Sequence, residues 1–207
     1  MRSSAALNST GRLDVREAKV GAARAGVISE LTVISKPHLF GQQLRASYAK
    51  LEIFLCAIFG MKKVLVLYYS RSGNTEKMAK AVMEGAQGVN DTVVDLTYHL
   101  DGASELAGYD AILVGAPTYR KEMPIDFKNL FQEAAEKGIN LKGKIGAAFG
   151  SYGWDGTAPA QVVELMQALG MVVSELPLLA KYIPDKAVLD ACIDLGRRIA
   201  ETLKNQP

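Results

Sequence analysis

Short apolar runs alternate with amphipathic helical patterns from residue 61 to the end of the chain. Strands are predicted at 63–69, 91–97, 111–115, 144–149 and from 171 onward. Helices are predicted at 75–87, 124–137, 158–169 and 185–204, with a short helical turn at 104–108. Because strict alternation favours crossover connections, the sequence predicts an α/β fold, a doubly wound parallel sheet with helices on both faces. The fully apolar run at 111–115 fits a strand covered on both sides.

The first 60 residues differ in composition from the rest of the chain. They hold eight Lys/Arg and four Asp/Glu, a net charge of +4, whereas residues 61–207 hold 16 and 18, a net charge of −2. The apolar run at 51–59 is too short to span a bilayer, so membrane attachment is not favoured. Met61 resembles a natural chain start. We therefore expect 1–60 to be a dispensable extension and 61–207 to be the functional domain.

The mildly acidic domain argues against nucleic acid as a partner, because phosphate backbones attract basic surfaces. Cys56 and Cys192 are the only cysteines, and His38 and His99 the only histidines. Two distant cysteines establish no disulfide framework, and two distant histidines do not favour a dedicated zinc or di-iron site. No metal ligand is therefore assigned.

The turn at 70–75 lies between the first predicted strand and the first helix. A helix N-terminus directs free N–H groups and a positive dipole end at such a turn, which suits a phosphate. Hydroxyls can donate to the anion, and the glycine lets the backbone curl around it. The alternative is a Ser/Asn-rich helix cap. Neither the Walker nor the Rossmann phosphate motif is present. The predicted phosphate residues are Ser70, Arg71, Ser72, Gly73, Asn74 and Thr75.

Two further loops follow the third and fourth strands, at 116–122 and 150–156. In a parallel sheet both would reach the same carboxyl edge as the turn at 70–75. Neither holds a Ser-His-Asp or Cys-His set, so no catalytic residue is assigned. Tyr119, Tyr152 and Trp154 could sandwich a flat ring, and Gly150 and Gly153 would let backbone amides approach it, although each aromatic taken alone is better explained by packing at the rim. A flat ring with a phosphate describes flavin mononucleotide (FMN).

Three segments resemble the FMN-binding segments of flavodoxins: Val-Leu-Val-Leu-Tyr-Tyr-Ser-Arg-Ser-Gly-Asn-Thr at 64–75, Gly-Ala-Pro-Thr-Tyr at 115–119, and Ala-Ala-Phe-Gly-Ser-Tyr-Gly-Trp at 147–154. The last two look most like the flavodoxin domains of flavodiiron proteins. The resemblance covers about 61–207. It implies the strand order 2-1-3-4-5, the short-chain type and non-covalent FMN held by the residues named above. It also adds Pro117, Thr118, Arg120, Ser151 and Asp155 as ring neighbours.

One loop departs from the family pattern. Flavodoxins surround the flavin with acidic residues and often place a glycine beside its redox-active nitrogen, whereas this loop carries Arg120 and Lys121. A cation near the ring would stabilise the reduced, anionic flavin and raise the potential of the second reduction step by tens of millivolts. The alternative is that Arg120 points into solvent and serves a partner surface.

The resemblance implies a cytoplasmic electron carrier that docks transiently to redox partner proteins. The alternative is an NAD(P)H:quinone reductase of flavodoxin fold. Those enzymes carry Gly-Gly-Gln-Glu after the fourth strand, where this chain has Asp155-Gly-Thr-Ala. A phosphatase is a third interpretation, because Cys192 and Arg198 match Cys-x5-Arg. Cys192, however, falls on the apolar stripe of the closing helix, not in a strand-to-helix loop.

The composition break yields a first prediction. A chain beginning at Met61 should be soluble, melt cooperatively and bind FMN, because the complete α/β alternation lies after that residue. Thermal melting and the absorption spectrum of the purified protein measure this. An insoluble or colourless product would mean that the apolar run at 51–59 belongs to the core.

Overall fold

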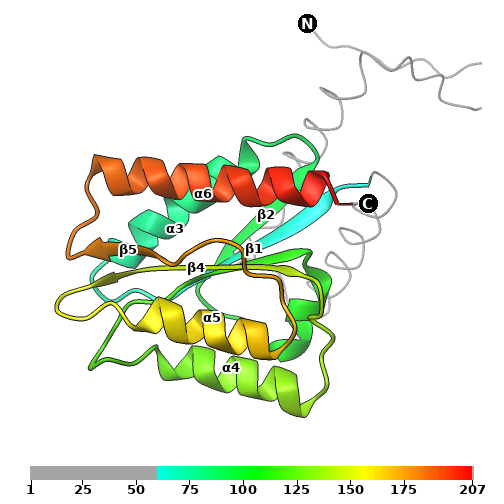
Figure 1. The fold of residues 1–207 in the computed structure, drawn as a ribbon, viewed down its shortest axis with the longest axis horizontal. Coiled ribbons are helices and arrows are strands. Elements are labelled where there is room, and N and C mark those ends of the chain that lie inside the picture. The colour runs from blue at the N-terminus through cyan, green and yellow to red at the C-terminus, as the bar shows by residue number, and fades with distance from the viewer. Residues whose placement is uncertain (1–59, 207) are drawn as a thin grey trace, which may run out of the picture. The chain divides into compact units, whose positions relative to one another are not determined.

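The structure is a computed structural model, and it describes residues 60–206 (Figure 1). The predicted extension at 1–60 therefore lies outside the described residues, except for Gly60. The described elements, in chain order, are β1 (Lys62–Tyr68), α3 (Asn74–Gln87), β2 (Thr92–Thr97), the 3-10 helix η2 (Ala103–Gly108), β3 (Ala111–Gly115), α4 (Ile125–Glu136), β4 (Ile145–Tyr152), α5 (Ala158–Ala168), β5 (Leu178–Lys181) and α6 (Lys186–Lys204).

The five strands form one parallel sheet in the order β2-β1-β3-β4-β5, which confirms the predicted topology. Helices α3 and α6 cover one face of this sheet, and α4 and α5 cover the other (Figure 1). The sheet is therefore doubly wound. Ligands of such sheets bind outside the carboxyl ends of the strands, close to the point where the strand order reverses. Here that point lies between β1 and β3.

Successive residues of β1 enter two different cores, since side chains alternate across a strand. Val64 and Val66 pack on the α3–α6 side, whereas Leu65 and Leu67 pack on the α4–α5 side. All five residues of β3 are buried, as its apolar run predicts. The helical stripes are largely confirmed, because the inward positions of α3 are fully buried. Leu130 of α4 lies on the inner stripe but is only partly buried.

The last strand differs from the prediction. Val172 makes a single parallel bridge to Ile145, and β5 itself begins only at Leu178. The partner strand advances four residues between the bridges at Ile145 and Phe149, while the edge chain advances six between Val172 and Leu178. Two extra residues therefore bulge out of the edge. Pro177 lies in this interruption and has no N–H to donate to the sheet.

Helices α3 and α6 cross in close contact through two glycines. A Cβ at Gly85 would lie 1.8 Å from the carbonyl oxygen of Ile193, and one at Gly196 would lie 2.0 Å from that of Val82. Both obstructing atoms belong to the backbone, so no side-chain rotation can make room. The α3 axis, and with it the turn that precedes α3, is consequently positioned by residues far along the chain.

Gly196→Ala should lower the free energy of unfolding by about 1–3 kcal/mol, because the new methyl group forces the helices apart. Urea unfolding measures this change. The matched control is Gly88→Ala: its φ is −68° and its nearest Cβ neighbour would be 3.4 Å away. That variant should stay within about 1 kcal/mol of the parent, on the stabilising side. Equal unfolding midpoints for the two variants would contradict the close crossing.

Candidate functional site

The loops after β1, β3 and β4 meet at the carboxyl edge of the sheet. Tyr69 N donates to the Gly115 carbonyl at 3.0 Å, and Thr118 N donates to the Ser151 carbonyl at 3.1 Å. Backbone pairing therefore continues beyond the strand ends and holds the three loops side by side. The structure thus brings together the three segments that the sequence analysis assigned to one site.

The turn at 70–75 has the backbone of an anion cradle. Gly73 adopts the left-handed conformation, with φ of 77°, and directly precedes α3. Its position as the N-cap means that no side-chain oxygen caps the helix there. The free N–H groups of the first turn of α3 therefore stay available to a ligand, as a phosphate site requires. The predicted alternative, a turn whose side chains serve as a helix cap, is not what the structure shows.

Thr75 connects the first loop to the third. Its hydroxyl lies 2.9 Å from that of Ser151, and it also accepts a hydrogen bond from Ser151 N at 3.4 Å. Thr75 has no exposed surface, and Ser151 is buried. This hydroxyl thus has a structural partner, so its role in the scaffold is established independently of any ligand.

Ser70 differs from Thr75 in this respect. Within residues 60–206, its hydroxyl oxygen is the one buried side-chain polar atom without a hydrogen-bond partner. A buried polar group left unsatisfied costs about 1–3 kcal/mol. A phosphate oxygen would accept a hydrogen bond from this hydroxyl and remove that cost. The unpartnered oxygen at an uncapped helix start therefore fits the phosphate end of FMN.

Arg71 turns from the phosphate turn toward the second loop. Its guanidinium lies 5.4 Å from the centre of the Tyr119 ring, and its Nε donates to the Tyr69 hydroxyl at 3.3 Å. The two tyrosine rings meet edge to face, with centres 6.1 Å apart. This stack joins the first loop to the second through a cation–π contact.

Arg120 and Lys121 form the tip of a tight turn. Tyr119 and Glu122 exchange two backbone hydrogen bonds of 3.0 Å, and both tip residues have positive φ, 53° and 69°. Left-handed backbone is uncommon for residues other than glycine, so the surroundings must hold it. The Lys121 carbonyl accepts hydrogen bonds from Thr157 Oγ1 at 2.9 Å and Gln161 Nε2 at 3.1 Å. The turn is therefore fixed to the start of α5, and both cationic side chains are exposed.

The third loop needs its first glycine and presents an open aromatic ring. A Cβ at Gly150 would lie 2.0 Å from the carbonyl oxygen of Ala116, so any side chain there would separate the second and third loops. Trp154 is 92% exposed. Packing at the rim, the alternative for each aromatic residue, therefore does not account for Trp154.

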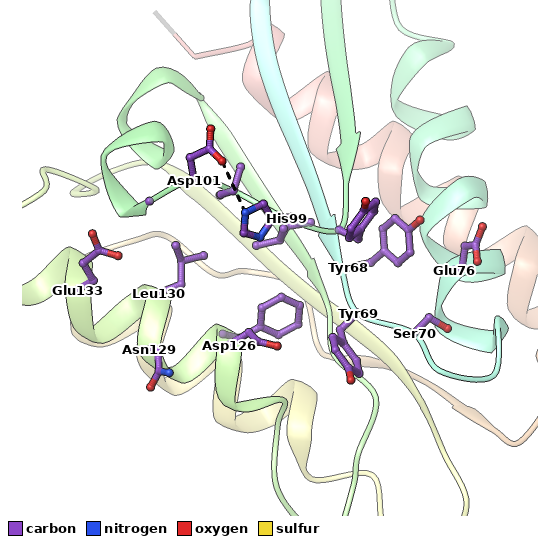
Figure 2. A pocket seen from close by; sticks show the side chains of 15 residues that line it. Tyr68, Tyr69, Ser70, Glu76, His99, Asp101, Asp126, Asn129, Leu130 and Glu133 are labelled. Carbon is purple, nitrogen blue, oxygen red and sulfur yellow. Dashed lines mark ion pairs between the residues drawn. The ribbon is translucent and has the colours of Figure 1, made fainter. Parts of the chain in front are cut away.

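A cavity of about 640 Å³ lies beside the phosphate turn, between the loop that follows β2 and helix α4 (Figure 2). Of the predicted site residues, Ser70 alone lines it. The cavity carries four carboxylates and one histidine, His99, but no lysine or arginine; the carboxylates are Glu76, Asp101, Asp126 and Glu133. Sequence reasoning missed this cavity because these residues share no motif and come from separate elements.

Cys192 lies in the core, not in a loop. It is fully buried on α6, and burial raises the pKa of its thiol to about 12. The thiol is therefore protonated at neutral pH and cannot act as a nucleophile. Arg198 pairs with Glu175 through two hydrogen bonds, of 3.1 and 2.8 Å. The phosphatase interpretation is thereby excluded.

Residues 60–206 offer neither a metal-binding cluster nor a membrane-spanning helix. No group of three or more His, Cys, Asp and Glu side chains in this range is arranged to hold a metal ion. No helix in the same range is both long and apolar enough to cross a bilayer.

Comparison with known proteins matches this arrangement to one family. The flavodoxin family model matches residues 66–196. A flavodoxin of Clostridium beijerinckii is 34% identical over 138 residues, which are 65% of this chain and 97% of that protein. A solved flavodoxin structure from the domain Archaea has a TM-score of 0.60 and 37% identity, covering 69% of this chain and 99% of that one.

Other relatives are longer than this chain or carry a different name. The type A flavoprotein fprA of Rhodobacter capsulatus is 35% identical over 157 residues, which are 72% of this chain but only 35% of that protein. A protein of Acidovorax ebreus named NAD(P)H dehydrogenase (quinone) is 35% identical in an alignment 144 residues long, which covers 56% of this chain and 72% of that protein. The predicted similarity to flavodiiron-type flavoproteins is thus found as well.

The fold and the three converging loops define a doubly wound α/β protein in which a glycine-capped helix start lies beside two loops with aromatic residues. The chain belongs to the flavodoxin family. With the family come the predicted cofactor, FMN, and the predicted class of function, electron transfer.

Ser70→Ala separates the phosphate role of this hydroxyl from a structural one. The dissociation constant for FMN should rise about 10- to 150-fold, equivalent to 1.5–3 kcal/mol for a hydrogen bond to a charged group. The FMN-free protein should be no less stable, because the change removes an unsatisfied buried oxygen. Flavin fluorescence titration and urea unfolding measure the two effects. The exposed Ser104→Ala is the matched control, and an unchanged FMN affinity in Ser70→Ala would remove this hydroxyl from the site.

Thr75→Ala should behave differently. It removes the hydroxyl that links the first and third loops, so FMN affinity and the stability of the FMN-free protein should both fall, each by about 1–3 kcal/mol. The same two measurements apply. A variant that loses FMN affinity with no loss of stability would show that the Thr75–Ser151 contact contributes nothing to the scaffold.

Proposed function

We propose that this protein is an electron carrier that holds FMN non-covalently at the carboxyl edge of its sheet. Ser70 and residues 72–75 bind the phosphate, Arg71 contacts Tyr69 and Tyr119 instead, and residues 117–120 and 150–155 border the flavin ring. FMN, when bound, supplies the capacity to accept and return electrons. The observation that carries this proposal is the unpartnered Ser70 hydroxyl beside the uncapped start of α3, held next to the loop of the exposed Trp154.

The cavity next to the phosphate turn favours a carrier over an NAD(P)H:quinone reductase. A nicotinamide dinucleotide brings a pyrophosphate, which needs cationic or N–H partners. The cavity lining includes no lysine or arginine that could bind that anion. Of its four carboxylates, Glu76 and Glu133 already pair with Lys80 and Lys137. The segment Asp155-Gly-Thr-Ala, which stands where the reductases have Gly-Gly-Gln-Glu, has a structural contact here: the Thr157 hydroxyl donates to the Lys121 carbonyl. The similarity to a quinone-named relative keeps the reductase as the second candidate.

A carrier of this kind exchanges electrons with partner proteins through transient contact, and we place this exchange in the cytoplasm. Cys192 supports this placement, since it is a free, buried thiol. Free thiols are typical of reducing compartments.

Two measurements on the full-length protein test the proposed function. Acid should release FMN from the purified protein, and the FMN-loaded protein should oxidise NADPH with a quinone no faster than free FMN does. The bound flavin should accept electrons once per molecule from a chemical reductant and return them once to an oxidant, without catalysing continued NADPH oxidation. Sustained NADPH oxidation that depends on the protein would establish the reductase instead, and a protein that takes up no FMN would overturn both candidates.

A further inference from the structure

An exposed apolar patch surrounds the third loop of the site. Trp154 is 92% exposed, Ile183 69% and Tyr182 60%. These residues belong to one surface, because Tyr182 N donates to the Tyr152 carbonyl at 2.7 Å and the Tyr182 ring lies against Gly153. Contiguous exposed apolar groups beside a functional site are typical of protein contact surfaces.

Cations border this patch. The Lys121 carbonyl accepts a hydrogen bond from Thr157, which follows the loop that carries Trp154. Arg120 and Lys121 together form the tip of the turn, so both lie on this side of the loop. Arg71 lies over the ring of Tyr119, the residue that precedes Arg120. On the other side of the loop, the exposed Lys181 pairs in register with Tyr152 of β4.

The charge of this border is opposite to that of the domain. Its four cations, Arg71, Arg120, Lys121 and Lys181, stand against two anions, Glu122 and Asp155, which leaves +2. Residues 61–207 as a whole sum to −2, from 16 basic and 18 acidic residues. Glu76 pairs with Lys80 at 2.7 Å and so does not offset the border. Asp185 caps α6 by accepting a hydrogen bond from Val188 N at 2.9 Å but keeps its negative charge, which lowers the local excess to +1. The surplus of positive charge is therefore local.

We propose that this surface, the apolar residues Trp154, Tyr182 and Ile183 with their border of Arg71, Arg120, Lys121 and Lys181, docks an acidic redox protein. The proposal rests on the proposed electron-carrier function and names the charge of its partner. Opposite charges steer the two proteins together and fix their orientation, while the apolar centre supplies the desolvated contact. The tip of the turn suits this role, since its backbone is anchored while its side chains remain in solvent.

The test uses the full-length, FMN-loaded protein and three oxidants that differ in charge: ferricyanide, p-benzoquinone and hexaammineruthenium(III). Two ferricyanide or two ruthenium ions, or one quinone, take up the two electrons of one fully reduced flavin. Protons released from the flavin pass to the buffer or to the quinone. Stopped-flow oxidation rates are compared for the parent, for R120E/K121E and for K142E/K204E. Lys142 and Lys204 are exposed and lie toward the opposite edge of the sheet, so the control changes the net charge equally.

At low ionic strength, R120E/K121E should lower the ferricyanide rate at least about fivefold relative to the benzoquinone rate, and it should raise the hexaammineruthenium rate. The control should change each ratio less than about twofold. High salt should abolish the differences, because mobile ions screen exposed charges. The neutral quinone corrects for any change of flavin potential caused by the loss of Arg120.

A protein arm tests the partner itself. A prereduced acidic [2Fe–2S] ferredoxin should pass its electron to the oxidised flavin faster in the parent than in R120E/K121E, at least about fivefold at low salt. Basic cytochrome c, which takes electrons from the reduced flavin, should show the reverse order. If neither the rates with the small oxidants nor those with the two proteins depend on charge, the docking proposal is overturned and the carrier function stays intact. A flavin that exchanges electrons with none of these reagents would instead overturn the carrier function.

Discussion

The close approach of three backbone loops at one edge of the sheet is the constraint on which the site depends. Parallel strands end at the same edge, but strand pairing alone leaves their loops free to diverge. Here the ladder continues past the strand ends, as the bond from Thr118 N to the Ser151 carbonyl shows. Gly150 permits that approach because no Cβ stands between it and Ala116. Affinity for a flat, anionic ligand therefore depends on backbone geometry before any side chain contacts the ligand.

A second close approach acts at a distance from the site. Gly85 and Gly196 let α3 and α6 pack backbone against backbone, and α3 begins at the phosphate turn. The direction of the first-turn N–H groups is thus determined by contacts near the other end of α3, with a helix on the same face of the sheet. Glycine thus has two roles here: it lets two loops approach each other, and it lets two helices cross closely. Together these contacts place the N-terminus of α3 beside the three loops.

Much of this could be predicted from the sequence, for physical reasons that differ between elements. The uniformly apolar run of β3 and the helical stripes report burial directly, so the helix positions and the parallel sheet covered on both faces follow, whereas the strand order came from the resemblance of three segments to flavodoxins. The burial pattern says less about where a strand begins and ends at the edge of the sheet. The segment at 171–173 has strand composition, yet the chain bulges before Leu178, and no periodicity reveals the two extra residues. The unpartnered state of Ser70 is likewise a property of its surroundings, since Ser72 and Thr75 have the same chemistry in the sequence.

The interrupted edge strand also limits strand pairing between copies of the molecule. An edge strand presents unpaired N–H and C=O groups, which invite pairing with another copy of the chain and eventual aggregation. β5 has only four residues, and the bulge with Pro177 breaks its line toward Val172. The edge therefore offers too short a template for a neighbouring strand to extend along. At this edge, therefore, the apolar surface beside the third loop is not accompanied by a strand long enough to pair with another copy.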